Sequence, residues 1–276
     1  KWFTINTSYL KGWFKMSGVV FILLLLGIGI LSGIISAAAG LASLVSYPSL
    51  LALGLPPVMA NVTSAFSTIT GNYSSVFSSF KELEHNRRQL WIILPLVFAG
   101  SIIGAFLLFA VPSKWFAELV PLCIALAGII LLFPHHPKQS TGTMAGNSKL
   151  FGKSRIGQFL SIIGIFIVGI YSGFFNAGAG VLMLTLLTVI NRQKSFAVNN
   201  ALKNVAMTVT NTTSWIVFAL ETTIYWNYVI PLMIGNVIGG YLGPIIVRHL
   251  PGRLMQIIVG IGSLILAVSL VIRNLM

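Results

Sequence analysis

The chain has 276 residues, of which 56% are hydrophobic and only 8% are charged, and its mean hydropathy is +0.94. Because about 25% of the residues in a soluble domain are charged, this composition excludes an ordinary soluble domain. Residues 16–80 contain no charged side chain, and several later apolar runs exceed the roughly 20 residues needed to cross a bilayer. The sequence therefore predicts an all-α polytopic membrane protein that has the lipid bilayer as a partner.

The net charge is strongly positive, with 17 Lys and Arg residues against four acidic residues and a formal charge of +13. In a soluble chain this balance would indicate nucleic-acid binding. Here the basic residues lie mostly in the short gaps between apolar runs, where they set the orientation of a membrane protein. We therefore expect no nucleic acid among the partners.

Residues that carry catalytic or metal chemistry are scarce. The single cysteine, Cys123, can form neither an internal disulfide nor a thiolate cluster. Asp is absent, and the four histidines lie in loops or in a Pro-rich linker rather than within apolar runs. Because catalysis inside a membrane needs a general base or a metal at depth, the sequence predicts no metal site, no cofactor and no enzyme activity.

The first 18 residues are expected to form an interfacial segment. Lys1, Lys11 and Lys15 are interspersed there with tryptophan and phenylalanine residues. This composition is typical of the membrane interface rather than of a cleavable signal. The first membrane segment therefore begins near Val19.

The first apolar segment, from about Val19 to Gly54, is too long for one plain helix. Some 35 helical residues extend about 50 Å, whereas the hydrocarbon core is about 30 Å thick. We expect the helix to break at Ser36–Gly40 and a second helical piece to follow. That piece ends at Gly54-Leu55-Pro56-Pro57, which combines a helix stop with a helix start.

The remainder of the first half contains three further segments. Val58–Phe80 carries eleven Asn, Ser and Thr side chains, and a basic loop is expected at Lys81–Gln89. In Leu90–Val111, two glycines are spaced for close helix packing. Trp115–Phe133 is the fourth segment, which completes a first transmembrane repeat at residues 19–133.

A second transmembrane repeat, residues 156–276, follows the linker at residues 134–155, which is rich in Pro, Gly, Ser, Thr and Lys. Its expected segments are Ile156–Ile190, Phe196–Leu220, Tyr225–Val247 and Leu254–Ile272. The first is again too long for one span. The second carries Asn200, Asn204, Thr208 and Asn211 at helical spacing, with Lys203 beside them.

An internal repeat relates the two halves. Gly29–Gly40 reappears 140 positions later as Gly169–Gly180, with seven of twelve residues identical, and Asn61 and Asn72 fall on Asn200 and Asn211 after a shift of 139. The sequence therefore predicts two homologous four-span halves, each of which opens with a broken or re-entrant helix.

The basic residues also predict an orientation. If each interrupted segment turns back to its own side, four loops share one face and hold eleven basic residues: 81–88, 134–155, 192–194 and 248–253. By the positive-inside rule this face, which includes the linker, is cytoplasmic, and both termini lie outside. The halves are then inverted repeats. If the first segment is instead a single tilted span, the N-terminus is inside.

A pair of interrupted apolar segments at matching positions indicates the binding site of a transporter. Helix breaks expose N–H groups and a positive dipole end, and Ser, Thr and Asn side chains donate hydrogen bonds to oxyanions. Lys203 supplies one positive charge, and no carboxylate lies mid-segment to repel an anion. The candidate substrate-binding residues are Ser36, Gly40, Asn61, Thr63, Ser64, Asn72, Asn176, Gly180, Asn200, Lys203, Asn204 and Asn211.

Three structural interpretations of the same residues stay open. The Ser and Thr hydroxyls of Val58–Phe80 can donate back to their own helix rather than to a ligand. The small-residue spacings are also typical of close helix packing without a site. Lys203 lies near the start of its segment, so its ammonium group can instead extend to the membrane surface.

At these residues the chain resembles the sulfite exporter TauE/SafE family. That family has two homologous halves with a glycine-rich helix break, a Leu-Pro-Pro step and a Thr-Ser pair. The corresponding elements here are Gly33–Gly40, Leu55-Pro56-Pro57 and Thr63-Ser64, then Gly173–Gly180 and Lys203 with Asn211.

The resemblance implies a carrier of small sulfur-containing or organic anions such as sulfite, sulfoacetate or another organosulfonate. It also implies a multi-pass protein of the bacterial inner membrane that exports its anion by alternating access around a midplane site between the repeats. An anion channel and an importer of the thiosulfate or sulfate type remain alternatives. A membrane-embedded enzyme is disfavoured, and the oligomeric state is not predicted.

Overall fold

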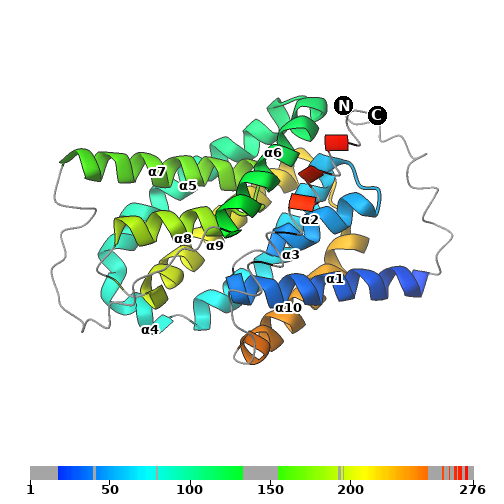
Figure 1. Ribbon diagram of the computed structural model, residues 1–276, viewed down its shortest axis with the longest axis horizontal. Helices are drawn as coiled ribbons and strands as arrows, with labels where there is room; N and C mark the ends of the chain where they lie inside the picture. Colours follow the sequence, from blue (N-terminus) through cyan, green and yellow to red (C-terminus); the bar gives the residue numbers. More distant parts are fainter. Residues whose placement is uncertain are drawn as a thin grey trace.

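The computed structural model describes residues 18–39, 42–78, 80–132, 155–191, 194, 196–247 and isolated positions between 257 and 272. Within these ranges the regular structure is helical, without strands, as the sequence predicts (Figure 1). The helices are α1 (Gly18–Ala39), α2 (Ala42–Ala52), α3 (Pro57–Ser78), α4 (Phe80–Leu83), η2 (Glu84–Asn86), α5 (Arg87–Ala110), α6 (Ser113–Leu132), α7 (Arg155–Phe174), α8 (Ala179–Ile190), α9 (Phe196–Glu221) and α10 (Trp226–Val247).

Three helices in the described part of the chain are long and apolar enough to cross a membrane: Gly18–Ser36 of α1, Arg87–Ala110 of α5 and Ile156–Phe174 of α7. Large apolar side chains such as Leu31, Trp91 and Phe159 are exposed on them, which is the surface that a bilayer covers. The structure therefore has the helical composition of a polytopic membrane protein. The predicted interfacial residues 1–17, the linker, and most of Leu254–Ile272 lie outside the described residues.

Both predicted helix breaks are confirmed. In the first half α1 ends at Ala39 and a separate helix begins at Ala42. In the second half α7 ends at Phe174 and α8 begins at Ala179, after Gly178 in the left-handed conformation with φ of 79°. Because such a φ favours glycine, this residue allows the chain to reverse direction.

The predicted stop at Gly54 is also confirmed. Gly54 has a φ of 86°, and its N–H donates to the carbonyl oxygen of Leu51 at 3.0 Å, while the N–H of Leu55 donates to that of Leu50 at 3.1 Å. These two bonds form a Schellman motif, which satisfies the last carbonyl groups of α2. α3 then begins at Pro57, where the missing N–H of proline costs nothing.

One local prediction is wrong. Residues 81–89, expected as a basic loop, form most of α4, all of η2 and the start of α5. The segment contains neither glycine nor proline, and its Lys, Glu, Leu, Arg and Gln residues are good helix formers. Charge alone did not identify a loop here, since these residues form helices wherever the backbone is free to do so.

Glycines allow two pairs of helices to approach closely. α1 packs against α10, where a Cβ added to Gly33 would lie 2.6 Å from the carbonyl oxygen of Asn236. α5 packs against α7, where a Cβ added to Gly100 would lie 2.7 Å from the carbonyl oxygen of Phe166. Each contact joins the first helix of one half to the third apolar segment of the other half, so the two contacts are reciprocal.

Further features relate the halves. In Figure 1 the N-terminal ends of α1 and α7 lie at opposite ends of the long axis, and both helices run toward the middle of the molecule. The hydroxyl groups of Tyr73 on α3 and Thr212 on α9 are 3.0 Å apart, and these residues are equivalent under the 139-residue shift. Two equivalent residues contact each other only near a two-fold axis. The equivalence of the halves as inverted repeats stays a prediction.

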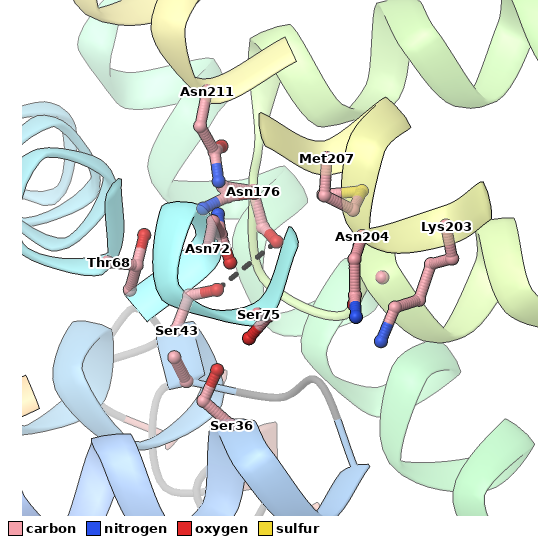
Figure 2. Close-up of a pocket in the computed structure, with 12 residues that line it drawn as sticks. Ser36, Ser43, Thr68, Asn72, Ser75, Asn176, Lys203, Asn204, Met207 and Asn211 are labelled. Atoms are coloured by element: carbon pink, nitrogen blue, oxygen red, sulfur yellow. Dashed lines mark hydrogen bonds between the residues drawn. The ribbon is translucent and has the colours of Figure 1, made fainter. Parts of the chain in front are cut away.

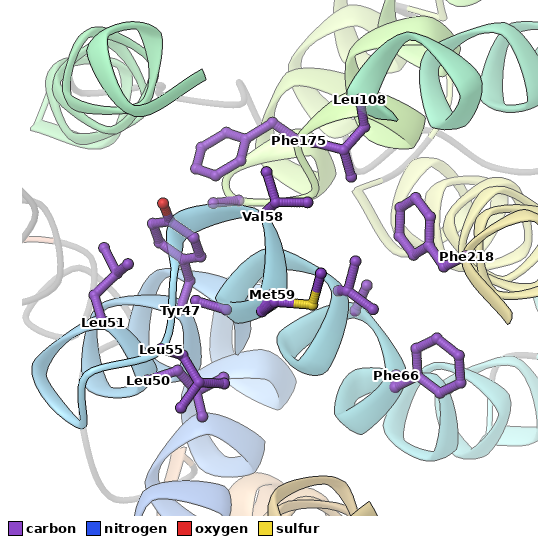
Figure 3. Close-up of a cluster of buried hydrophobic side chains, with 14 of the residues drawn as sticks. Tyr47, Leu50, Leu51, Leu55, Val58, Met59, Phe66, Leu108, Phe175 and Phe218 are labelled. Carbon is purple, nitrogen blue, oxygen red and sulfur yellow. The ribbon is translucent and has the colours of Figure 1, made fainter. Parts of the chain in front are cut away.

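The core consists of two apolar clusters. The larger one gathers Tyr47, Leu50, Val58 and Met59 of the first half with Phe175 and Phe218 of the second (Figure 3). The smaller one lies among α5, α7, α8 and α9 and includes Val97, Met183 and Leu202. Both clusters draw side chains from both halves, so neither half can bury its apolar surface alone.

Adjacent glycines on α10 test the close packing. A Cβ at Gly239 would overlap the carbonyl oxygen of Ile30, whereas one at Gly240 would meet nothing within 4 Å. Gly239→Ala should therefore destabilise the protein by about 1–3 kcal/mol and lower the Tm measured in detergent. Gly240→Ala, the matched control, should leave the Tm unchanged or raise it, because alanine favours the helix. Equal Tm values would contradict the packing of α1 on α10.

Candidate functional site

A small polar pocket lies between the two helix breaks and the polar helices α3 and α9. Its volume is about 30 Å³, which is room for one or two water molecules, so a larger ligand needs the pocket to widen. Both halves contribute to its wall (Figure 2). The lining residues are Ser36, Ala42, Ser43, Thr68, Asn72, Ser75, Asn176, Gly180, Lys203, Asn204, Met207 and Asn211.

The two breaks are tied together across the halves. The Ser43 hydroxyl, near the start of α2, donates to the backbone carbonyl oxygen of Asn176 in the second break at 3.2 Å, the dashed line in Figure 2. The Asn61 side-chain amide of α3 donates to the carbonyl oxygen of Phe174 at 3.0 Å. Carbonyl groups that leave the α7 helix thus obtain partners inside the protein, as backbone at membrane depth requires.

One face of α3 and one face of α9 form the walls. Thr68, Asn72 and Ser75 recur at helical spacing on α3, and Lys203, Met207 and Asn211 do so on α9. The amides of Asn72, Asn176 and Asn211 gather on one side of the pocket in Figure 2, and Lys203 and Asn204 extend into the other side. The pocket therefore has an amide-rich side and a cationic side.

Lys203 is a buried cation without a counter-ion. Its side chain is only 6% exposed, and within the described residues it makes no hydrogen bond or ion pair. No carboxylate lines the pocket. A charge buried in a membrane protein normally faces a cavity and is paired, so the arrangement suits an anionic ligand.

Asn211 adds an open hydrogen-bonding position. Its side chain is 2% exposed, and its amide oxygen has no partner in the described part of the chain. Buried polar groups without a partner are uncommon and call for an explanation. This oxygen accepts hydrogen bonds, so a water in the pocket can be its partner, whereas an anion would have to bind the amide N–H groups of the same side chain.

Seven of the predicted site residues line the pocket, and they come from both breaks and from α3 and α9. They are Ser36, Asn72, Asn176, Gly180, Lys203, Asn204 and Asn211. Gly40 lies outside the described residues.

Four other predicted residues are described and lie outside the lining. The Asn61 amide holds the α7 carbonyl, the Ser64 hydroxyl is 2.6 Å from that of Ser46, and Thr63 is buried. Asn200 is half-buried. Three of these four thus lie within the packed interior beside the pocket.

Five lining residues were not predicted from the sequence: Ala42, Ser43, Thr68, Ser75 and Met207. Thr68 and Ser75 are four residues before and three residues after Asn72, so helical spacing from that asparagine identifies them. Ser43 had no such signal, because its position depends on how α2 returns after the break. Among the described residues no group of three His, Cys or acidic side chains is placed to hold a metal ion.

The fold and the pocket define a class of protein: a helical membrane protein whose two halves enclose a polar pocket with one unpaired cation. The chain belongs to the sulfite exporter TauE/SafE family, whose family model matches residues 25–270. The resemblance found in the repeated motifs is thereby confirmed. Membership indicates a membrane transporter of the TauE/SafE type.

Curated relatives carry consistent names. The chain is 28% identical to a probable membrane transporter protein of Haemophilus influenzae over 255 residues, which cover 92% of this chain and 96% of the relative. It is 24% identical to the probable membrane transporter protein YfcA of Escherichia coli K12 over 257 residues, 90% of each chain. It is 22% identical to the probable membrane transporter protein ORF9 of a Sinorhizobium species, over 87% of this chain and 88% of the relative. No solved structure gives a significant match.

Gly178 tests how the second break shapes the pocket. Its φ of 79° costs about 1–2 kcal/mol for a residue with a Cβ. Gly178→Ala should therefore lower the Tm and weaken any ligand binding that depends on Asn176 and Gly180. Gly71→Ala, at a position on α3 where a Cβ meets nothing within 4 Å, is the control. An unchanged Tm in Gly178→Ala would show that the break does not depend on this glycine.

Proposed function

We propose that the chain is a carrier of small sulfur-containing or organic anions, of the sulfite, sulfoacetate or organosulfonate type. It exports them across the bacterial inner membrane by alternating access around the pocket. The observation that supports this most is Lys203, a buried cation that faces a pocket without a carboxylate. An anion that enters the pocket supplies the missing counter-charge.

The rest of the lining suits the oxygen atoms of such an anion. The Asn72, Asn176 and Asn211 side chains offer amide donors, and Ser36 offers a hydroxyl donor. The hydroxyls of Thr68 and Ser75 donate to carbonyl oxygens of α3 at 3.1 Å and 2.9 Å, so they would have to turn to reach an anion. α8 begins at Ala179, and its second residue, Gly180, lines the pocket. The positive end of the α8 dipole thus points to the same space.

Alternating access has support in the arrangement of the halves. The opposite directions of α1 and α7, the reciprocal glycine contacts and the pairing of Tyr73 with Thr212 are what inverted repeats require. In such carriers one repeat rocks against the other around a site at the midplane. A pocket of only about 30 Å³ is small for a continuous anion pathway and therefore favours a carrier over an open channel.

The experiment that tests this proposal is transport by purified protein in liposomes. Saturable exchange of sulfite or an organosulfonate supports the carrier, whereas single-channel currents would support a channel. Counting anions moved outward and inward in oriented vesicles separates an exporter from an importer. A protein that moves none of sulfite, sulfoacetate, thiosulfate or sulfate would refute the proposal.

The pocket residues give a sharper prediction. Lys203→Ala and Asn211→Ala should abolish anion transport while the Tm without ligand changes little. Removing one member of a buried charge pair costs about 2–5 kcal/mol, so anion affinity in Lys203→Ala should fall roughly 30-fold or more. Lys114→Ala, which removes an exposed lysine of α6, is the matched control and should transport normally. Unchanged uptake by the pocket variants would remove both residues from the site.

A further inference from the structure

A second cation lies in a polar network between the halves, outside the pocket. The Lys194 ammonium group, in the turn between α8 and α9, donates to the side-chain oxygens of Asn86 and Gln89, the latter at 2.6 Å. The Gln89 amide donates to Asn191 at 2.8 Å, and the Asn191 amide donates to Asn199 at 3.1 Å. The first half contributes Asn86 and Gln89, and the second half contributes the other three residues.

Lys194 also lacks a carboxylate partner in the part of the chain that the structure describes. Its two hydrogen-bond acceptors are neutral amide oxygens, and burial lowers the pKa of its amine. Glu82 is one turn from Asn86, but its buried Oε2 has no hydrogen-bond partner, and Glu84 is exposed. A half-buried cation whose hydrogen-bond acceptors are neutral keeps a charge that attracts an anion.

Asn199 belongs to this network and lies on the same helix, α9, as Lys203 of the pocket. Its side chain is 1% exposed, and its Nδ2 has no partner among the described residues. Asn199 precedes Lys203 by four residues, so the two lie on the same face of α9, about 6 Å apart along the helix axis. An unpartnered buried donor of this kind is rare in native structures, and it can donate to an oxyanion, which accepts hydrogen bonds.

We infer that Lys194 and Asn199 form a second, weaker station for a small oxyanion on its way to or from the Lys203 pocket. An arriving anion takes the place of the amide oxygens at Lys194 and accepts a hydrogen bond from Asn199. This inference rests on the proposed function, since it names a further binding position for the same class of anion. No covalent step is involved.

The equivalent position in the other half has different chemistry. A shift of 139 or 140 residues places Lys194 at Leu55 or Gly54, where the α2–α3 connection packs in the larger apolar cluster. There the Thr222 hydroxyl donates a weak hydrogen bond to the sulfur of Met59 at 3.6 Å. The station therefore has no equivalent in the other half, and it lies on the face that the basic loops predict to be cytoplasmic.

The test measures the Tm of the full chain in detergent while sodium sulfite is titrated, with sodium chloride at equal ionic strength as reference. Lys203→Ala removes the pocket cation and leaves the network intact. It should keep a residual stabilisation that needs about tenfold more sulfite than wild type, since bound ligand stabilises according to its occupancy. The double variant Lys203→Ala with Lys194→Gln should lose this residual stabilisation.

Matched variants separate charge from folding. Glutamine at position 194 still donates to the amide oxygens, so Lys194→Gln removes the charge and preserves the hydrogen bonding. Lys203→Ala with Lys114→Gln changes an exposed lysine of α6 instead and should keep the residual stabilisation. The readout is the sulfite-dependent change in Tm, which a purely structural role of Lys194 would not alter.

Three outcomes would overturn the station. They are a residual stabilisation that is equal with and without Lys194, the absence of any residual stabilisation in Lys203→Ala, and stabilisation by short-chain phosphatidylglycerol but not by sulfite. The last result would assign the network to a lipid phosphate. If sulfite stabilises wild type only at the higher concentrations, and this stabilisation requires Lys194, the proposed pocket is wrong and the station is supported.

Discussion

A backbone that leaves the helical conformation at membrane depth must find its hydrogen-bond partners inside the protein, and the second break of this chain finds them in the first half. The Ser43 hydroxyl reaches the carbonyl oxygen of Asn176, and the Asn61 amide reaches that of Phe174. The close glycine contacts of α1 with α10 and of α5 with α7 bring the halves near enough for this. The polar pocket is a consequence, because the same breaks place polar atoms in the centre.

The scaffold is close to symmetric, but its charge is not. Asn72 and Asn211 are equivalent under the 139-residue shift, and both line the pocket. Lys203 instead corresponds to Ser64, whose hydroxyl contacts that of Ser46 in the packed interior. One half therefore supplies the cation and the other half supplies neutral donors. An anion that paired with this cation would lie nearer to α9, the helix that also carries Asn199.

Family membership and site chemistry bear on different parts of the functional conclusion. The TauE/SafE match and the names of the relatives indicate a membrane transporter. The charge of the carried molecule is an inference from the pocket, where Lys203, four asparagines and the start of α8 converge without a carboxylate. The two arguments are independent, because one depends on similarity over residues 25–270 and the other on a handful of side chains.

The sequence by itself determined the helical membrane class, the helix breaks, the Gly54 stop and the polar character of α3 and α9. These features follow from short-range properties: the length of an apolar run against the thickness of a bilayer, and the backbone freedom of glycine and proline. Only the tertiary structure decided that Asn72 and Asn211 line the pocket while Asn61 holds a backbone carbonyl, and that Ser43 meets Asn176. Which face of a helix turns inward, and where α2 returns, depend on packing against the other half, and no local pattern encodes that contact.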